Sequence, residues 1–184
     1  AEAPRSGLNA QKKNVLFSTS SAQRTNRRAK ISRHIPMNCD RVLDAPMLRA
    51  DYYCNPMDWS VQENILAVAL EGTIYLWNAE TGDAEELSNI SSICKEEEGQ
   101  YISALKFIKA GSNGNTLAIA VSTNDIYLYD IASAKKLRKM SGHVDVINAL
   151  DWNRHILSSS CQDGSIFNHD VRSREHKVGS FLGH

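Results

Sequence analysis

A short hydrophobic pattern recurs three times along the chain, and this repeat constrains the fold more than any other feature. The copies are Ile-Tyr-Leu-Trp-Asn at 74–78, Ile-Tyr-Leu-Tyr-Asp at 126–130 and Ile-Phe-Asn-His-Asp at 166–170, at spacings of 52 and 40 residues. An apolar run and a polar turn precede each copy, and another apolar stretch lies further upstream, carrying Trp59, Phe107 or Trp152. Each unit therefore contains at least three short strands separated by turns.

A fourth short strand follows each copy after a polar turn and ends near Leu87, Met140 or Leu182. Four short antiparallel strands that recur every 40 to 50 residues are typical of a β-propeller blade. The sequence thus predicts an all-β fold with about three blades, at about 52–92, 100–140 and 143–184. Because strand side chains alternate between two faces, Ile74 and Leu76 should share one face of the first blade and Tyr75 and Trp77 the other.

Charge divides the chain into a basic N-terminal segment and an acidic remainder. Residues 1 to 42 hold nine Lys and Arg against two acidic residues, whereas the whole chain holds 21 of each. With few large apolar residues to bury, residues 1–40 are expected to be a flexible basic tail or linker, followed by a folded region at 41–184. The tail could contact nucleic acid, but no aromatic residues interleave its cations, so we favour a solvated or protein-docking segment and expect no specific nucleic acid and no membrane partner.

The four cysteines do not form a recognisable metal-binding pattern. Their positions are Cys39, Cys54, Cys94 and Cys161, with no Cys-x-x-Cys pair and no histidine at ligand spacing. We therefore expect reduced thiols, no metal and no cofactor. No apolar run is long enough to span a bilayer or act as a signal peptide, which favours a location in the cytoplasm and nucleus.

Two dipeptides in the third unit match the frame of WD repeats. Gly142-His143 is followed by His169-Asp170, with His169 in the place of the usual Trp, and Gly183-His184 repeats the Gly-His pair. In this frame His143, Asp163 and a hydroxyl among Ser158 to Ser160, which we assign to Ser159, should form a buried network that braces the blade. A catalytic His-Asp pair is the weaker alternative, and no catalytic residue is assigned.

Longer segments resemble the Fizzy family of activators of the anaphase-promoting complex, a ubiquitin ligase. The resemblance rests on Arg41 to Pro46, Asp51-Tyr52-Tyr53, Met57 to Ser60, Asn64 to Asn78, Asp151-Trp152-Asn153 and His169 to Arg172. It covers roughly residues 13 to 184, and the segments before the blades favour the subgroup named after Fizzy itself. It implies a WD-repeat β-propeller of seven blades, of which this chain holds about three.

The family resemblance also implies a function and a set of binding residues. A Fizzy-type protein is a substrate-recognition co-activator, not an enzyme, that binds destruction-box and KEN-type degrons in cell-cycle proteins such as cyclins. Asp44 matches the residue that receives the destruction-box arginine, with Leu43 beside it, and Asp51 matches a KEN-binding acidic residue. The implied partners are subunits of the anaphase-promoting complex, degron-bearing substrates and spindle-checkpoint proteins.

Departures from the family pattern keep other interpretations open. The family's N-terminal docking motif and its Ile-Arg C-terminal tail are not found, and about four blades are missing. We expect a crop of a longer protein or a shortened product rather than half of an assembly. The alternative function is a truncated or generic WD-repeat scaffold without ligase-activating ability. A propeller enzyme is disfavoured because no paired carboxylates or nucleophile-base set is evident.

Overall fold

The computed structural model describes residues 35–94, 99–109 and 115–183. The chain divides into two compact units, residues 1–43 and 44–184, and all the described strands belong to the second unit. Most of the expected tail, residues 1–34, lies outside the described residues, as does His184. The expectation that the tail is flexible therefore stays a prediction.

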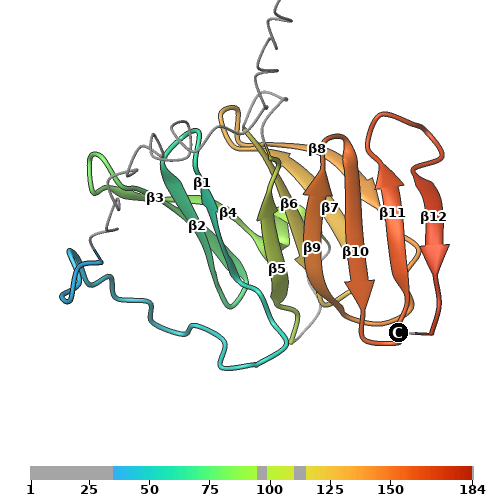
Figure 1. The fold of residues 1–184 in the computed structure, drawn as a ribbon, viewed down its shortest axis with the longest axis horizontal. Coiled ribbons are helices and arrows are strands. Elements are labelled where there is room, and N and C mark those ends of the chain that lie inside the picture. Colours follow the sequence, from blue (N-terminus) through green and yellow to red (C-terminus); the bar gives the residue numbers. More distant parts are fainter. Residues whose placement is uncertain (1–34, 95–98, 110–114, 184) are drawn as a thin grey trace, which may run out of the picture. The chain divides into compact units, whose positions relative to one another are not determined.

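Twelve strands form three four-stranded antiparallel sheets within the described residues (Figure 1). Each sheet is a meander, because its strands pair in chain order. The first sheet holds β1 (Met57–Ser60), β2 (Ile65–Leu70), β3 (Thr73–Asn78) and β4 (Ala84–Asn89), and the short helix α2 (Ile90–Ile93) follows it. The second holds β5 (Ile102–Phe107), β6 (Thr116–Val121), β7 (Asp125–Asp130) and β8 (Lys135–Met140), and the third holds β9 (Ile147–Asn153), β10 (Ile156–Cys161), β11 (Ile166–Asp170) and β12 (Lys177–Phe181).

Tight turns join the second and third strands of each sheet at the places where the sequence predicts them. Glu71, Asn124 and Gly164 occupy these turns with φ values of 54°, 68° and 83°. Positive φ is uncommon outside glycine, although asparagine tolerates it well. These turns hold the pairings of β2 with β3, β6 with β7 and β10 with β11 in register.

Two hydrophobic clusters hold the sheets against one another. The first joins side chains of the first and second sheets, such as Ile74 and Leu117, and the second joins the second and third sheets, such as Ile126 and Leu157. The second sheet is thus covered on both faces, and all four central residues of β7 are buried. In β3, by contrast, buried Ile74 and Leu76 alternate with half-buried residues. This burial is the packing expected of adjacent propeller blades.

The described residues contain no helix that is both long and apolar enough to cross a membrane. Cys39 is exposed, Cys54 and Cys94 are half-buried and Cys161 is buried, and none of these four described cysteines forms a disulfide.

Candidate functional site

The chain leading into the first sheet carries the residues expected to bind peptides. Leu43 ends the first compact unit and Asp44 begins the second. Leu43 is 44% exposed, and Asp44 is exposed as well. Within the described part of the chain, the Asp44 carboxylate has no hydrogen-bond or ion-pair partner. A free carboxylate at the surface can receive a guanidinium through two parallel charge-assisted hydrogen bonds.

Asp51 lies in a turn that its own carboxylate helps to hold. The Tyr53 amide donates to Asp51 Oδ1 at 3.0 Å, and Arg49 Nε lies 3.8 Å from Oδ2. The Arg49 guanidinium stacks over the Tyr101 ring at 3.6 Å, which is cation–π geometry. Because the Asp51 side chain is 34% exposed and a carboxylate has about four acceptor sites, it can still accept a further donor from solvent.

Asn55 ties this segment to the second and third sheets. Its amide donates to Ser103 O at 2.8 Å, and its carbonyl accepts from the Leu105 amide at 3.0 Å. Its side-chain Nδ2 donates to Asn148 O at 2.7 Å. The segment around Asp51 is therefore fixed to the blades by backbone as well as side-chain bonds. Sequence reasoning missed Asn55, since its partners are distant in the chain.

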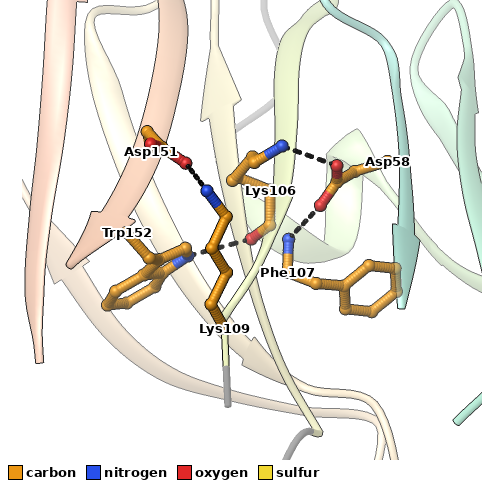
Figure 2. A network of polar contacts seen from close by, with 6 residues as sticks. All are labelled: Asp58, Lys106, Phe107, Lys109, Asp151 and Trp152. Carbon is orange, nitrogen blue, oxygen red and sulfur yellow. Dashed lines mark hydrogen bonds and ion pairs between the residues drawn. The ribbon is translucent and has the colours of Figure 1, made fainter. Parts of the chain in front are cut away.

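Asp58 links the first sheet to the second (Figure 2). Its Oδ1 accepts from Lys106 Nζ and its Oδ2 from the Phe107 amide, both at 2.7 Å. The Asp58 side chain is only 15% exposed and that of Lys106 26%. Charge-assisted hydrogen bonds in such a partly dry setting are stronger than those at the open surface. Asp58 therefore braces the seam between these two sheets.

Lys106 also takes part in the seam between the second and third sheets. Figure 2 shows Trp152 Nε1 directed at the Lys106 carbonyl, at 3.2 Å. Nearby, Lys109 Nζ lies 2.7 Å from Asp151 Oδ1, in a pair whose side chains are about 60% exposed. The C-terminal end of β5 is thus bonded to the first sheet as well as to the third. Trp152 was predicted only as part of an apolar stretch, and its hydrogen bond is an additional role.

The third sheet contains a hydrogen-bonded chain of buried polar side chains. His143 Nε2 lies 2.7 Å from Ser159 Oγ, which in turn lies 2.9 Å from His169 Nε2. His143 and Ser159, two of the residues expected to brace the blade, thus contact each other directly. The structure extends this row of hydrogen-bonded side chains to His169, which occupies the Trp position of the WD frame.

Asp163 differs from the expectation of a buried network member. It is exposed, and its Oδ1 accepts from the Ser165 amide at 2.8 Å. The hydroxyl of Ser165 then lies 3.3 Å from His143 Nδ1, so Ser165 connects the two. Hydrogen bonds from the Ser165 hydroxyl, the Ser165 amide and the Cys161 thiol lower the pKa of the Asp163 carboxyl to about 2. Asp163 therefore carries a negative charge at neutral pH.

His176 continues the histidine chain toward the surface. His169 Nδ1 lies 2.9 Å from His176 Nδ1, so one of the two rings must donate and the other accept. Burial, and then the neighbouring His176, lower the pKa of His169 to about 4. Both rings are consequently neutral at pH 7, because burial also lowers the pKa of His176. Sequence reasoning missed His176, which no motif marks.

Known proteins resemble this chain in both sequence and structure. A family model described as the anaphase-promoting complex subunit 4 WD40 domain matches residues 86–155. "Anaphase-promoting complex subunit cdc20" of Dictyostelium discoideum is 43% identical over 152 residues, which are 83% of this chain and 29% of the relative. "WD repeat-containing protein slp1" of Schizosaccharomyces pombe (strain 972 / ATCC 24843) is 39% identical over 145 residues, 79% of this chain and 28% of the relative. The chain belongs to the Fizzy family.

Solved structures agree with this assignment. A chain in "Crystal Structure of Mitotic Checkpoint Complex" matches the Fizzy-family chain with a TM-score of 0.70 and 39% identity, over 79% of this chain and 43% of that one. "Crystal structure of RRP9 WD40 repeats" matches with a TM-score of 0.58 at 20% identity, over 74% of this chain and 41% of that one, which supports the fold alone. The predicted all-β, WD-repeat propeller architecture is confirmed. The Fizzy-family chain spans less than a third of the length of the two curated relatives named here.

Proposed function

We propose that this chain is part of a substrate-recognition co-activator of the anaphase-promoting complex and binds degron peptides from cell-cycle proteins. The observation that carries the proposal is the sequence identity of 39–43% to relatives named as anaphase-promoting complex and WD-repeat proteins. The proposed partners are subunits of that complex, degron-bearing substrates such as cyclins, and spindle-checkpoint proteins. The proposed location is the cytoplasm and nucleus.

One exposed and one half-buried carboxylate supply the proposed contacts. Asp44, next to the exposed apolar side chain of Leu43, would receive the arginine of a destruction box while Leu43 packs against an apolar residue of the same peptide. Asp51 would receive a donor from a KEN-type degron on a turn that Asn55 holds against the sheets. Tyr52 and Tyr53 beside it are 95% and 67% exposed, and their rings form an edge-to-face pair. Extended peptides are held by a few such anchors together with backbone hydrogen bonds.

Fluorescence anisotropy with labelled destruction-box and KEN peptides tests the assignment. Asp44→Asn should weaken the destruction-box peptide about tenfold, because a charged hydrogen-bond acceptor contributes about 1.5 kcal/mol. Asp51→Asn should weaken the KEN peptide by a similar factor. Glu85→Gln serves as the matched control, since Glu85 is an exposed carboxylate on β4.

The same variants are best measured in two proteins. One is the 184-residue chain, and the other is a chimera that continues into the following blades of the Dictyostelium discoideum relative. A generic WD-repeat scaffold would bind neither peptide in either protein. If both peptides bind the chimera equally well with and without the two aspartates, the assignment of Asp44 and Asp51 is wrong.

A further inference from the structure

Three side chains with metal-binding atoms meet at one end of the third sheet. His143 precedes β9, Cys161 ends β10, and Asp163 lies in the turn before β11. One ligand atom from each, an imidazole nitrogen, the thiol sulfur and a carboxylate oxygen, lie within 4.8 Å of one another. His143 is remote from the other two in sequence, and the antiparallel pairing of β9 with β10 brings it close. Sequence spacing alone therefore gave no sign of this cluster.

The cluster has the composition of a zinc site with an open position. Sulfur, nitrogen and oxygen ligands all bind Zn²⁺, and three protein ligands plus water complete a tetrahedron. With metal–ligand distances of about 2.0–2.3 Å, the ligand atoms of such a site lie about 3.5 Å apart. The three ligand atoms would therefore have to move about 1 Å closer together to reach this geometry. Asp163 is exposed on a turn and can supply that shift by rotating its side chain.

The hydrogen bonds on the side of the His143 ring that faces away from the cluster suit a metal ligand. The chain from His143 through Ser159 and His169 to His176 can run in either direction, because each imidazole has two tautomers. If Nδ1 binds a cation, Nε2 carries the proton and donates to Ser159 Oγ at 2.7 Å. Most metal-binding histidines are oriented by such an acceptor, which bonds the ring nitrogen that does not touch the metal.

Space for the remaining ligand lies beside the cluster. A cavity of about 200 Å³ is lined by Cys161, Ser165 and three neighbouring residues, Ser160, Gly164 and Ile166. This volume is ample for water, which needs only about 30 Å³ in the liquid. Ser165, whose hydroxyl is 3.3 Å from His143 Nδ1, would turn away from that nitrogen when the cation binds.

We propose that His143, Cys161 and Asp163 bind Zn²⁺, with water as the fourth ligand. The cation links the loop before β9 to the turn between β10 and β11 and so clamps one end of the third blade. This site is independent of the proposed peptide-binding residues, which lie before the first blade. The outcome of a metal-binding experiment therefore neither supports nor contradicts the proposed function.

Cobalt titration of the untagged, reduced 184-residue chain tests the site. Co²⁺ replaces Zn²⁺ in such sites and is visible when a thiolate binds it, through a charge-transfer band in the near ultraviolet. We expect one Co²⁺ per chain, displaced by added Zn²⁺. Cys161→Ser should abolish the band, whereas the matched substitutions Cys39→Ser, Cys54→Ser and Cys94→Ser should leave it intact.

Asp163→Ala provides a second measurement that does not depend on a buried side chain. Because Asp163 is exposed, this variant should fold. It should bind Co²⁺ at least about tenfold more weakly, since even the loss of a residue that only hydrogen-bonds to a metal ligand costs about 10–100-fold. If Cys161→Ser fails to fold, the Asp163→Ala result decides. The proposal is overturned if the wild-type chain shows no such band, if the band survives in folded Cys161→Ser, or if Asp163→Ala binds Co²⁺ as tightly as the wild type.

Discussion

Asp58 and Asp151 form ion pairs of the same length in very different surroundings. Each carboxylate lies 2.7 Å from a lysine Nζ, but Asp58 is 15% exposed and Asp151 is 62% exposed. Asp58 also accepts a backbone hydrogen bond from Phe107. An exposed pair is screened by water and contributes little, whereas the loss of a partly buried carboxylate leaves its partners unsatisfied.

The two aspartates therefore give a matched test of the seam. Asp58→Ala should lower the free energy of unfolding by about 2–3 kcal/mol, since Lys106 and the Phe107 amide both lose their acceptor. Asp151→Ala should lower it by less than about 1 kcal/mol. Urea unfolding followed by circular dichroism measures both changes. Equal losses in the two variants would show that the Asp58 network does not hold the first two sheets together.

The lowered pKa of His169 predicts that the stability of the fold depends on pH. Burial, with His176 next, lowers its pKa to about 4, and in an unfolded chain a histidine has a pKa of about 6.5. Between these values the unfolded chain binds more protons, so stability is complete above about pH 6.5 and falls as the pH approaches 4. The loss attributable to His169 is at most about 3 kcal/mol. His143, His176, Lys177 and Arg138 also act on this ring, and all four lower its pKa.

His169→Gln isolates this contribution because glutamine keeps a donor for Ser159 but does not titrate in this range. Urea unfolding at several pH values, with EDTA present to exclude metals, should give a shallower slope between pH 6.5 and 4.5 for the variant. An unchanged slope would mean that His169 is not held in its neutral form.

At the scale of elements, the middle sheet should be sensitive to loss of apolar volume on its buried strand β6 but not on its outer strand β8. Leu117 on β6 is fully buried between the first and second sheets, whereas Leu137 on β8 of the same sheet is 57% exposed. Leu117→Ala should cost about 2–5 kcal/mol, and Leu137→Ala less than about 1 kcal/mol. Thermal unfolding separates the two, and a comparable effect of both would contradict the packing described for β6.

The sequence predicted the strands better than it predicted what lies between the sheets. β2, β6 and β10 follow from their apolar runs, and their hairpin turns follow from polar and glycine residues. The helix α2 was not predicted, because four residues are too short to show a helical period. It forms where Asn89 caps it, accepting from the amide and the hydroxyl of Ser92 at 3.1 and 2.9 Å.

At the scale of the molecule, the contacts that could not be predicted from the sequence are those that join one sheet to another. Periodicity fixes which face of a strand a residue occupies, but not which residue of the next sheet it meets. The contacts of Asn55 with Ser103 and of Asp58 with Lys106 belong to this class. Leu43, Asp44 and Asp51 came from the family resemblance, and their role in peptide binding stays a prediction.

The fixed segment before the first sheet gives the molecule a defined surface for an extended peptide. Asp44 and part of the Asp51 side chain are accessible there, while Asn55 joins the segment to the second and third sheets. The central claim is that degrons bind at this segment rather than on the outer strands.

Hydrogen–deuterium exchange of the chimeric protein with and without a destruction-box peptide tests that claim most directly. The account predicts slower exchange for amides between residues 43 and 55 when peptide is bound, and less of this protection after Asp44→Asn at the same peptide concentration. Protection confined to the outer strands β4, β8 or β12, with residues 43–55 unchanged, would contradict it.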